Sequence, residues 1–227
     1  MAYVLGYIYA DGSLDDSSYM RGKYIQITST DEDSIQRIKN WLSSEHKINK
    51  KRSNFIGGKI CFVLRIGSHK IYNDLFRLGL YPNKSLTVNF PKVPRKYLGH
   101  FIRGYFDGDG CVHFARSKGK TGKLIIKRVR VIFTSGSKVF LENMNKILMV
   151  AGIEEGKIYS SKRSYQAIYN TKDSMKIFKL IYRDASINSF FMRKFRVFNN
   201  YFILQSKVID ITISKIIDFH IGGHVVK

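Results

Sequence analysis

One stretch of sequence occurs twice, and this repeat constrains the fold more than any other feature. The first copy spans residues 4–12 and the second spans residues 102–110. Both contain Gly-Tyr and end in a small residue followed by Asp-Gly. The aspartates of the two endings, Asp11 and Asp109, are 109 − 11 = 98 residues apart in a chain of 227. A repeat on this scale indicates a duplicated domain rather than a solenoid unit.

Small residues in each copy predict two helices that pack against each other. Gly6 and Ala10 are four residues apart, as are Gly104 and Gly108, so each pair shares one face of a helix. Small residues at this spacing let two helix backbones approach closely. We also expect the glycine after each aspartate to take the left-handed conformation that ends many helices.

Side-by-side packing of the two helices would bring Asp11 and Asp109 to the same end of the pair. Two carboxylates that close repel each other unless a cation lies between them, and oxygen ligands with water nearby suit Mg²⁺. A purely structural role as helix caps explains the aspartates poorly, because an acidic residue at a helix C-terminus opposes the helix dipole.

The duplicated motif resembles that of the LAGLIDADG homing endonucleases, in their single-chain form with two repeats. The resemblance extends from the first residue to the low 200s. Two positions depart from the motif: Tyr9 replaces its first acidic residue, and Arg103 stands where a small residue is usual. Neither is a metal-ligand position of the motif.

The resemblance implies a metal-dependent endonuclease that cuts double-stranded DNA and leaves 3′ overhangs. Asp11 and Asp109 would bind Mg²⁺ or Mn²⁺, together with the backbone carbonyls of Ala10 and Gly108. The family also places a basic residue near the scissile phosphates, and the matching positions are Lys84 and Lys194. In a chain so rich in lysine, solvated surface side chains are the alternative for these two positions.

The composition fits a nucleic-acid partner. Lys and Arg number 39 against 17 acidic residues, which gives a formal charge of +22; such an excess favours a polyanion. No apolar run approaches the roughly 20 residues of a spanning helix, and no leader precedes the first motif. We therefore expect an intracellular protein, cytoplasmic or organellar. Cys61 and Cys111, far apart in the sequence, are expected to be small core residues in a reducing compartment.

The chain in order predicts an α+β fold in which the sequence α-β-β-α-β-β-α occurs twice. Each repeat would form a four-stranded antiparallel sheet with helices on one face, and the motif helices would join the repeats. The expected boundaries are residues 1–81 for the first repeat, 82–97 for a proline-containing linker, 98–205 for the second repeat and 206–227 for a tail. The protein is expected to be a monomer with internal pseudo-two-fold symmetry.

Strand and helix patterns give more detailed expectations. In the strand 23–29, Ile25 and Ile27 should face the helices because they alternate with polar residues. Helix starts are predicted after Thr30, Ser68 and Ser137, and a last helix at 174–182. His220 and His224 have the spacing of metal ligands on a helix. Since Gly222 and Gly223 lie between them, we expect no helix and no metal there.

The resemblance implies that the open sheet faces lie along DNA in the major groove, where base pairs are distinguishable. The polar and basic residues expected to contact DNA are Lys23, Tyr24, Gln26, Thr28, Lys51, Arg52, Lys59, Arg65, Arg116, Arg128, Arg130, Thr134, Lys162 and Gln166. Because the two repeats differ, the target should be long and non-palindromic.

Other functions were weighed against this one. A non-cleaving binder of the same fold, either an RNA maturase that acts on an intron or a transcription regulator, is the main alternative. The sequence has no P-loop, no zinc-finger cysteines and no Gly-x-Ser-x-Gly. The 16 Phe and 14 Tyr could stack on single-stranded bases, but most occupy apolar positions and are expected to be core.

Overall fold

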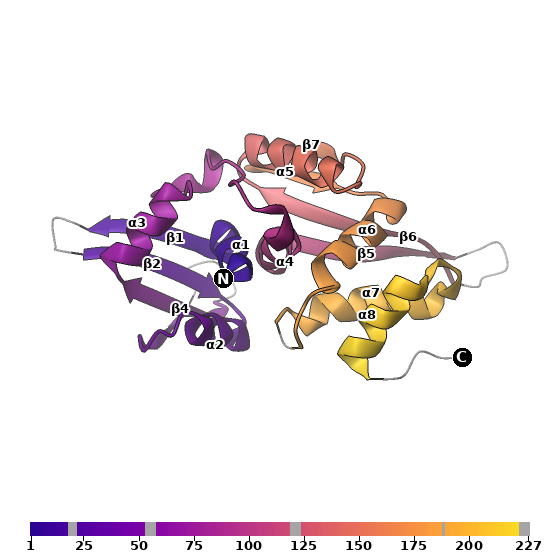
Figure 1. Ribbon diagram of the computed structural model, residues 1–227, viewed down its shortest axis with the longest axis horizontal. Helices are drawn as coiled ribbons and strands as arrows, with labels where there is room; N and C mark the ends of the chain where they lie inside the picture. Colours follow the sequence, from indigo (N-terminus) through magenta and orange to yellow (C-terminus); the bar gives the residue numbers. More distant parts are fainter. Residues whose placement is uncertain (18–21, 53–57, 119–123, 188, 223–227) are drawn as a thin grey trace. The chain divides into compact units, whose positions relative to one another are not determined.

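The computed structural model describes residues 1–17, 22–52, 58–118, 124–187 and 189–222. The chain forms two compact units, Met1–Gly108 and Asp109–Lys227. Each unit contains one four-stranded sheet in which all paired strands are antiparallel. The expected α+β fold is therefore confirmed (Figure 1).

The first unit has the strand order β1-β2-β4-β3. Its helices and strands are α1 (Ala2–Asp11), β1 (Gly12–Ser17), β2 (Gly22–Ser29), α2 (Glu32–Trp41), β3 (Ile48–Arg52), β4 (Ile60–Gly67) and α3 (His69–Arg77). The segment predicted as a linker contains two short 3-10 helices, η2 (Lys84–Leu86) and η3 (Arg95–Tyr97), and leads into α4 (Leu98–Asp109).

The second unit repeats this plan with the strand order β5-β6-β8-β7. Its elements are β5 (Gly110–Lys118), β6 (Leu124–Ser135), α5 (Lys138–Val150), β7 (Lys157–Ser161), β8 (Ser164–Ile168), α6 (Thr171–Tyr182), α7 (Met192–Leu204), η4 (Ser206–Val208) and α8 (Ile211–Ile221). With α1 and α4 as the leading helices, the order α-β-β-α-β-β-α occurs twice, as predicted.

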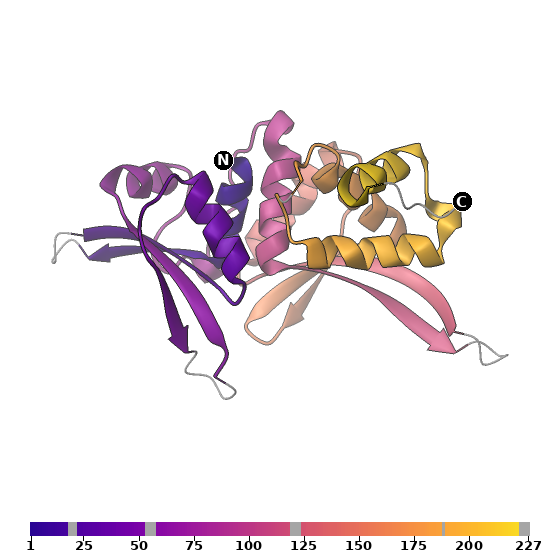
Figure 2. The same ribbon diagram turned by 90° about the horizontal axis from the view of Figure 1, so that it is seen from below.

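Helices cover one face of each sheet, and the described part of each unit leaves the other face without a helix (Figure 2). The alternation in β2 places Ile25 and Ile27 on the helix side, where both are fully buried. In β6 the residues Val129, Val131 and Phe133 are likewise fully buried. Period-2 alternation thus separates a core face from an open face in each sheet, as the sequence predicts.

Two of the three predicted helix caps are confirmed. The Ser68 hydroxyl accepts a hydrogen bond from the Ile71 N–H at the start of α3, and the Ser137 hydroxyl accepts from the Phe140 N–H at the start of α5. The prediction of Thr30 is wrong, because Asp31 precedes α2 and makes no side-chain capping bond. Instead, the Ser29 hydroxyl accepts a hydrogen bond from the Asp31 N–H. The side chain that stabilises this turn is therefore one residue before Thr30.

The C-terminal part of the second unit is more helical than predicted. The helix α6 begins at Thr171, three residues earlier than expected, because the Asn170 side chain caps it. A helix ahead of the two glycines was not predicted, and α8 contains His220. The expected break between His220 and His224 is confirmed, because α8 ends at Ile221 and Gly222 has a left-handed φ of 70°. His220 is buried, and its Nε2 lies 3.2 Å from the Tyr182 carbonyl oxygen. His224 lies outside the described residues.

Aromatic residues form the core of this C-terminal part. The centroid of the Phe178 ring lies 5.0–5.7 Å from the ring centroids of Tyr182, Phe195, Phe198 and Phe202. All five side chains are fully buried. This packing confirms the expectation that most aromatic residues serve the core rather than stack on bases.

The prediction that the two cysteines are core residues is wrong. Cys61 is half-buried and Cys111 is exposed. In β4 and β5 they alternate with the buried residues Leu64 and Val112, so both lie on open faces. The apolar neighbours of the cysteines in the sequence suggested burial, but a shift of one residue along a strand moves a side chain to the other face of the sheet.

Close backbone packing joins α1 to α4 within the first unit. A Cβ added to Gly6 would lie 2.0 Å from the Phe101 carbonyl oxygen, and one added to Gly104 would lie 2.0 Å from the Tyr3 carbonyl oxygen. The two helices therefore touch reciprocally through glycine. Any side chain at either position would push the helices apart, as the spacing of small residues predicts.

Gly6→Ala is accordingly expected to destabilise the protein by about 3 kcal/mol or more, since a backbone atom cannot move aside for the new methyl group. Gly152→Ala is the control: Gly152 has a φ of 81° and nothing within 4 Å of an added Cβ, so only backbone strain of about 1 kcal/mol is expected. Urea unfolding measures both. Equal effects would contradict the close packing of α1 on α4.

Candidate metal and nucleic-acid site

The motif Asp11 lies at a direct junction between helix and strand. α1 ends at Asp11, and β1 begins with Gly12. The expected left-handed glycine is not observed, because Gly12 is extended, with φ −96° and ψ 153°. Glycine is required there for space instead: an added Cβ would lie 2.6 Å from Ile8 Cγ2 and 2.7 Å from the Ile8 carbonyl oxygen.

The Asp11 carboxylate packs against a residue of α4 that has no side chain. A Cβ on Gly108 would lie 2.4 Å from the Ala10 Cβ and 3.1 Å from Asp11 Oδ2. A small residue is therefore required at position 108, because Ala10 and the Asp11 carboxylate already occupy the place of a side chain. Ala10, Asp11, Gly108 and Asp109 are all half-buried, so their oxygen atoms are not sealed in the core. Asp109 follows Gly108 directly in the chain.

Tyr7 contributes a buried phenol beside the same carboxylate. Burial raises the pKa of Tyr7 well above its usual value, and the charge of Asp11 raises the pKa further, while a hydrogen bond with Ser29 lowers it. The phenol consequently keeps its proton throughout the physiological range. Tyr7 can act there as a hydrogen-bond donor but not as a base.

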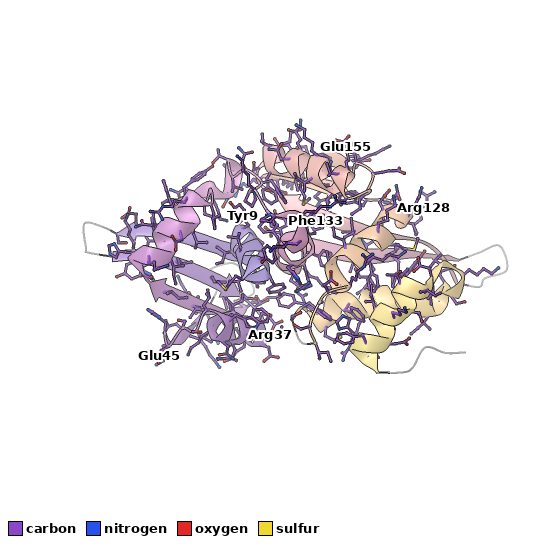
Figure 3. The ribbon with its side chains drawn as sticks, viewed as in Figure 1. Tyr9, Arg37, Glu45, Arg128, Phe133 and Glu155 are labelled. Atoms are coloured by element: carbon purple, nitrogen blue, oxygen red, sulfur yellow. The ribbon has the colours of Figure 1, made fainter. Side chains whose placement is uncertain are left out.

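The residue that departs from the motif at position 9 belongs to the core. Tyr9, labelled in Figure 3, is buried. Its hydroxyl donates to the Leu78 carbonyl oxygen, and its ring packs edge-on against Phe101. The matching residue of the second copy, Asp107, is also buried and accepts a hydrogen bond of 2.8 Å from the Tyr3 hydroxyl. This motif position therefore serves helix packing in both copies.

Arg103, the other departure from the motif, is also buried in the first unit. Its guanidinium lies 5.4 Å from the centre of the Tyr3 ring and 3.0 Å from His100 Nδ1. The long side chain is accommodated because it packs against these two rings. The close contact with α1 is made by the next residue, Gly104.

Lys84 and Lys194 are buried and occupy matching places beside the motif ends. Lys84, the first residue of η2, donates from Nζ to the Tyr9 carbonyl oxygen at 2.9 Å. Lys194, in the first turn of α7, donates to the Gly110 carbonyl oxygen at 2.6 Å. Their exposed fractions are only 5% and 8%. The interpretation of either lysine as a solvated surface residue is therefore wrong.

The helix that carries Lys194 was not predicted. This lysine was expected after the last helix of the repeat, whereas it lies in the first turn of the further helix α7. α7 packs on β5 and β6. Four phenylalanines and a tyrosine at helical spacing between Phe191 and Phe202 were the signal that could have revealed α7.

The donors at the motif end fit a hard divalent cation. Carboxylate and backbone carbonyl oxygens are the ligands that Mg²⁺ takes in proteins, usually with one or two carboxylates and substrate phosphates. Gly108 lets Ala10 and the Asp11 carboxylate pack directly against the α4 backbone, because an added Cβ would lie 2.4 Å from the Ala10 Cβ. Within the described ranges, no group of three or more His, Cys, Asp and Glu side chains could hold a metal. A metal at this site would need ligands beyond the protein's side chains.

The open face of the first unit carries polar residues from all four strands. Tyr24, Gln26 and Thr28 of β2 alternate with buried isoleucines, as predicted. Register places Arg65 opposite Gln26 and Lys51 opposite Cys61, so both lie on this face. The same register adds Ser13, Asp15 and Asn49. Asp15 was not among the predicted contacts, although a hairpin register for β1 and β2 could have revealed it.

The open face of the second unit is also basic. Arg128, Arg130 and Thr134 alternate with the buried residues of β6, and Arg128 is labelled in Figure 3. Gln166 lies opposite Thr134. Register adds His113 opposite Arg130, and Lys157 opposite Ile168. Lys157 and Tyr159 were missed, although both are exposed on β7 and alternate like the residues of β6.

Two predicted contact residues lie on the helix side of the first sheet. Lys23 alternates with Tyr24, and its Nζ lies 4.9 Å from the centre of the Tyr72 ring on α3. Arg52 lies opposite Ile60, on the side of Lys50, which is paired with Glu32 at 3.7 Å. The grouping of adjacent residues such as Lys51 and Arg52 on one face is wrong, because side chains alternate along a strand.

The remaining predicted contacts lie at strand ends. Lys59 directly precedes β4, and Lys162 occupies the turn between β7 and β8; both are exposed. Arg116 pairs with Ile126 in β5 and β6, and its side chain lies outside the described residues.

No helix in the described segments combines the length and the apolar character needed to cross a bilayer.

A family model described as a LAGLIDADG-like domain matches residues 96–190. Among curated relatives, a probable translation initiation factor IF-2 of Methanocaldococcus jannaschii is 28% identical over 72% of the chain, and a reverse gyrase of the same organism is 25% identical over 83%. The chain spans only 12% and 11% of the lengths of these proteins.

Several solved structures share the fold, among them I-DmoI, which is described as a homing endonuclease. A mutant of I-SmaMI matches with a TM-score of 0.63 at 14% identity, covering 99% of each chain. I-AabMI bound to uncleaved DNA matches with a TM-score of 0.59 at 14% identity, covering 97% of each chain. I-DmoI in complex with DNA and Ca matches with a TM-score of 0.53 at 21% identity, covering 81% of this chain and 88% of that chain.

Proposed function

We propose that this protein, which carries a LAGLIDADG-like domain and has the fold of the two-repeat LAGLIDADG proteins, is a site-specific endonuclease for double-stranded DNA. The observation that carries the proposal is the matched arrangement at the two motif ends. At each end an aspartate terminates the motif helix, and a buried lysine is bonded to a backbone carbonyl within two residues of that aspartate.

Several observations support DNA as the substrate. Two of the solved structures with this fold are described as bound to DNA, and the chain has a formal charge of +22. Its open sheet faces carry Lys51, Arg65, Arg128 and Arg130. The two curated relatives have names that describe different activities, so the segment they share with this chain does not account for either name.

The residues that would bind a divalent metal are Asp11 and Asp109, with the carbonyl oxygens of Ala10 and Gly108. Mg²⁺ or Mn²⁺ bound there would lower the pKa of water and neutralise charge that develops on phosphate oxygens. One solved structure of this fold contains Ca, and another is described in the presence of Mg.

The buried lysines would position the motif ends and stabilise negative charge. Each ammonium is held at one place because it donates to a fixed carbonyl and is enclosed by the core. Negative charge accumulates on the phosphate oxygens during the reaction. A fixed positive charge nearby therefore stabilises the transition state more than the ground state. Tyr7 would donate a hydrogen bond to Asp11 and keep that carboxylate oriented.

The two sheet faces carry different side chains, so the preferred target is a long, non-palindromic sequence read by a monomer. A DNA substrate places the protein in a compartment that holds DNA, the cytoplasm or an organelle. A second function in RNA splicing stays compatible with the fold, since the same basic faces could bind intron RNA. A splicing assay run beside the cleavage assay separates the two functions.

Asp11→Asn and Asp109→Asn are each expected to abolish double-strand cleavage with Mg²⁺ while DNA affinity changes little. The substitution removes a metal-binding charge, whereas affinity rests on phosphate contacts elsewhere. Cleavage of a target selected from a random library measures the first effect, and a filter-binding titration measures the second. Asp74→Asn on α3 is the control and should cut normally. Wild-type cleavage by either motif variant would refute that residue's assignment.

DNA affinity is expected to fall steeply with salt, with a log–log slope on the order of several units, because each phosphate contact releases counterions. Titrations between low and physiological salt measure the slope. A nearly flat response would exclude a large basic interface with DNA.

Lys194→Ala and Arg130→Ala are expected to have opposite effects. Lys194 is buried at a motif end, so its loss should slow single-turnover cleavage at saturating enzyme and leave base preference unchanged. Arg130 is on the open face, where an arginine can discriminate a guanine by about 1–3 kcal/mol; its loss should change preference at a few target positions. If the two residues are merely positive charges, both variants will weaken binding equally on every sequence.

A further inference from the structure

The open face of the first unit contains a cluster of four side chains, Arg65, Asp15, Tyr24 and Ser17. Arg65 Nη2 lies 2.7 Å from Asp15 Oδ2, and the guanidinium carbon lies 4.0 Å above the centre of the Tyr24 ring. Asp15 is held in turn, because the Ser17 hydroxyl donates to its Oδ1 at 3.2 Å. The cluster joins β1, β2 and β4 across the sheet.

Two glycines hold the Tyr24 ring flat on the sheet. A Cβ on Gly22 would lie 2.1 Å from Tyr24 Cε2, and a Cβ on Gly67 would lie 3.3 Å from Cε1. Gly67 is the register partner of Tyr24, and Gly22 precedes Tyr24 by two positions on the same face. The ring therefore lies over bare backbone and offers its face to Arg65, a favourable arrangement for a guanidinium.

The charge of the cluster is unsuited to binding phosphate. An arginine that only attracts phosphates gains from a free charge, but the carboxylate of Asp15 cancels the charge of Arg65. Both side chains remain about half exposed, at 43% and 50%, so the pair itself adds little to stability. What the cluster provides is a fixed direction for the guanidinium.

We propose that Arg65 reads a guanine in the DNA target and that Asp15 and Tyr24 position its guanidinium for that contact. The ion pair engages one nitrogen, and a guanidinium carries five N–H donors in a rigid fork. A second edge of the fork can therefore donate to O6 and N7 of guanine, the pair of acceptors that arginine binds in the major groove. Asp15 is a positioning residue, since it acts through Arg65.

This inference rests on the proposed function, because it needs a DNA target, but its test does not depend on cleavage. The probe is a library of double-stranded DNA randomised over the target, and the readout is base preference among bound molecules recovered in Ca²⁺. Wild-type protein should prefer guanine at one position that Arg65→Ala no longer discriminates, with a loss of about tenfold or more. Arg65→Lys should lose the same preference and keep overall affinity, because lysine retains the charge but not the fork.

Asp15→Asn separates positioning from simple charge. It should weaken the guanine preference at the Arg65 position and raise affinity for all sequences, because a negative charge leaves the DNA-facing side. In an Arg65→Ala background, Asp15→Asn should leave the preference profile as it is, as a double-mutant cycle requires of residues that act together. The exposed pair Arg77 and Asp74 on α3 is the matched control; Arg77→Ala and Asp74→Asn should leave every preference intact.

The outcomes distinguish this proposal from the function beneath it. A guanine preference that survives Arg65→Ala, or one that Asp15→Asn leaves unchanged, would overturn the proposed reader even if the protein cuts DNA. Specific binding without cleavage would refute the endonuclease activity but not the recognition of guanine by Arg65. Wild-type protein without preference at any position would refute both.

Discussion

The contact of α1 with α4 through glycine is the constraint on which the candidate site depends. Gly6 and Gly104 bring each backbone within a van der Waals contact of the other, and Gly108 continues this contact to the end that carries Asp11. At that end Gly108 packs against the methyl group of Ala10 and the carboxylate of Asp11. Because backbone rather than flexible side chains sets the spacing, the position of the Asp11 carboxylate is tied to the packing of the helix pair.

The lysines extend this control to the start of each sheet. Each lysine comes from a segment that follows the sheet in the chain, and it donates a hydrogen bond to a backbone carbonyl at the motif end. Lys84 donates to Tyr9, and Lys194 donates to Gly110. A buried ammonium is unfavourable unless it is hydrogen-bonded. The same bonds that make the burial tolerable hold both charges close to the motif aspartates, so packing and chemistry place the same demand on these residues.

The sequence predicted the elements with strong periodicity and missed those whose context is tertiary. The duplicated motif predicted the helix pair, and alternation in β2 and β6 predicted which residues face the core. Lys23, Arg52 and the two cysteines were assigned wrongly, because composition shows that a strand is basic or apolar but not which register it takes. Gly12 was predicted to be a left-handed helix cap. Its backbone is extended, and glycine is needed there because a side chain would collide with Ile8.

Helix α8 was not predicted because the alternating isoleucines at its start fit a strand equally well. Helix α7 was not predicted although its aromatic residues have helical spacing. The roles of Asp15 and Gly22 also depend on cross-strand contacts, which no local pattern contains. Lys84 and Lys194 were found by matching their places in the two repeats, and only the structure gives their burial and their carbonyl partners.

The most direct test of the endonuclease is to sequence the DNA ends made by wild-type protein on a library-selected target with Mg²⁺. The account predicts a double-strand break at one fixed position within the bound sequence, with 3′ overhangs, and none when the metal is chelated. Tight, sequence-specific binding that leaves both strands intact in Mg²⁺ and in Mn²⁺ would contradict it.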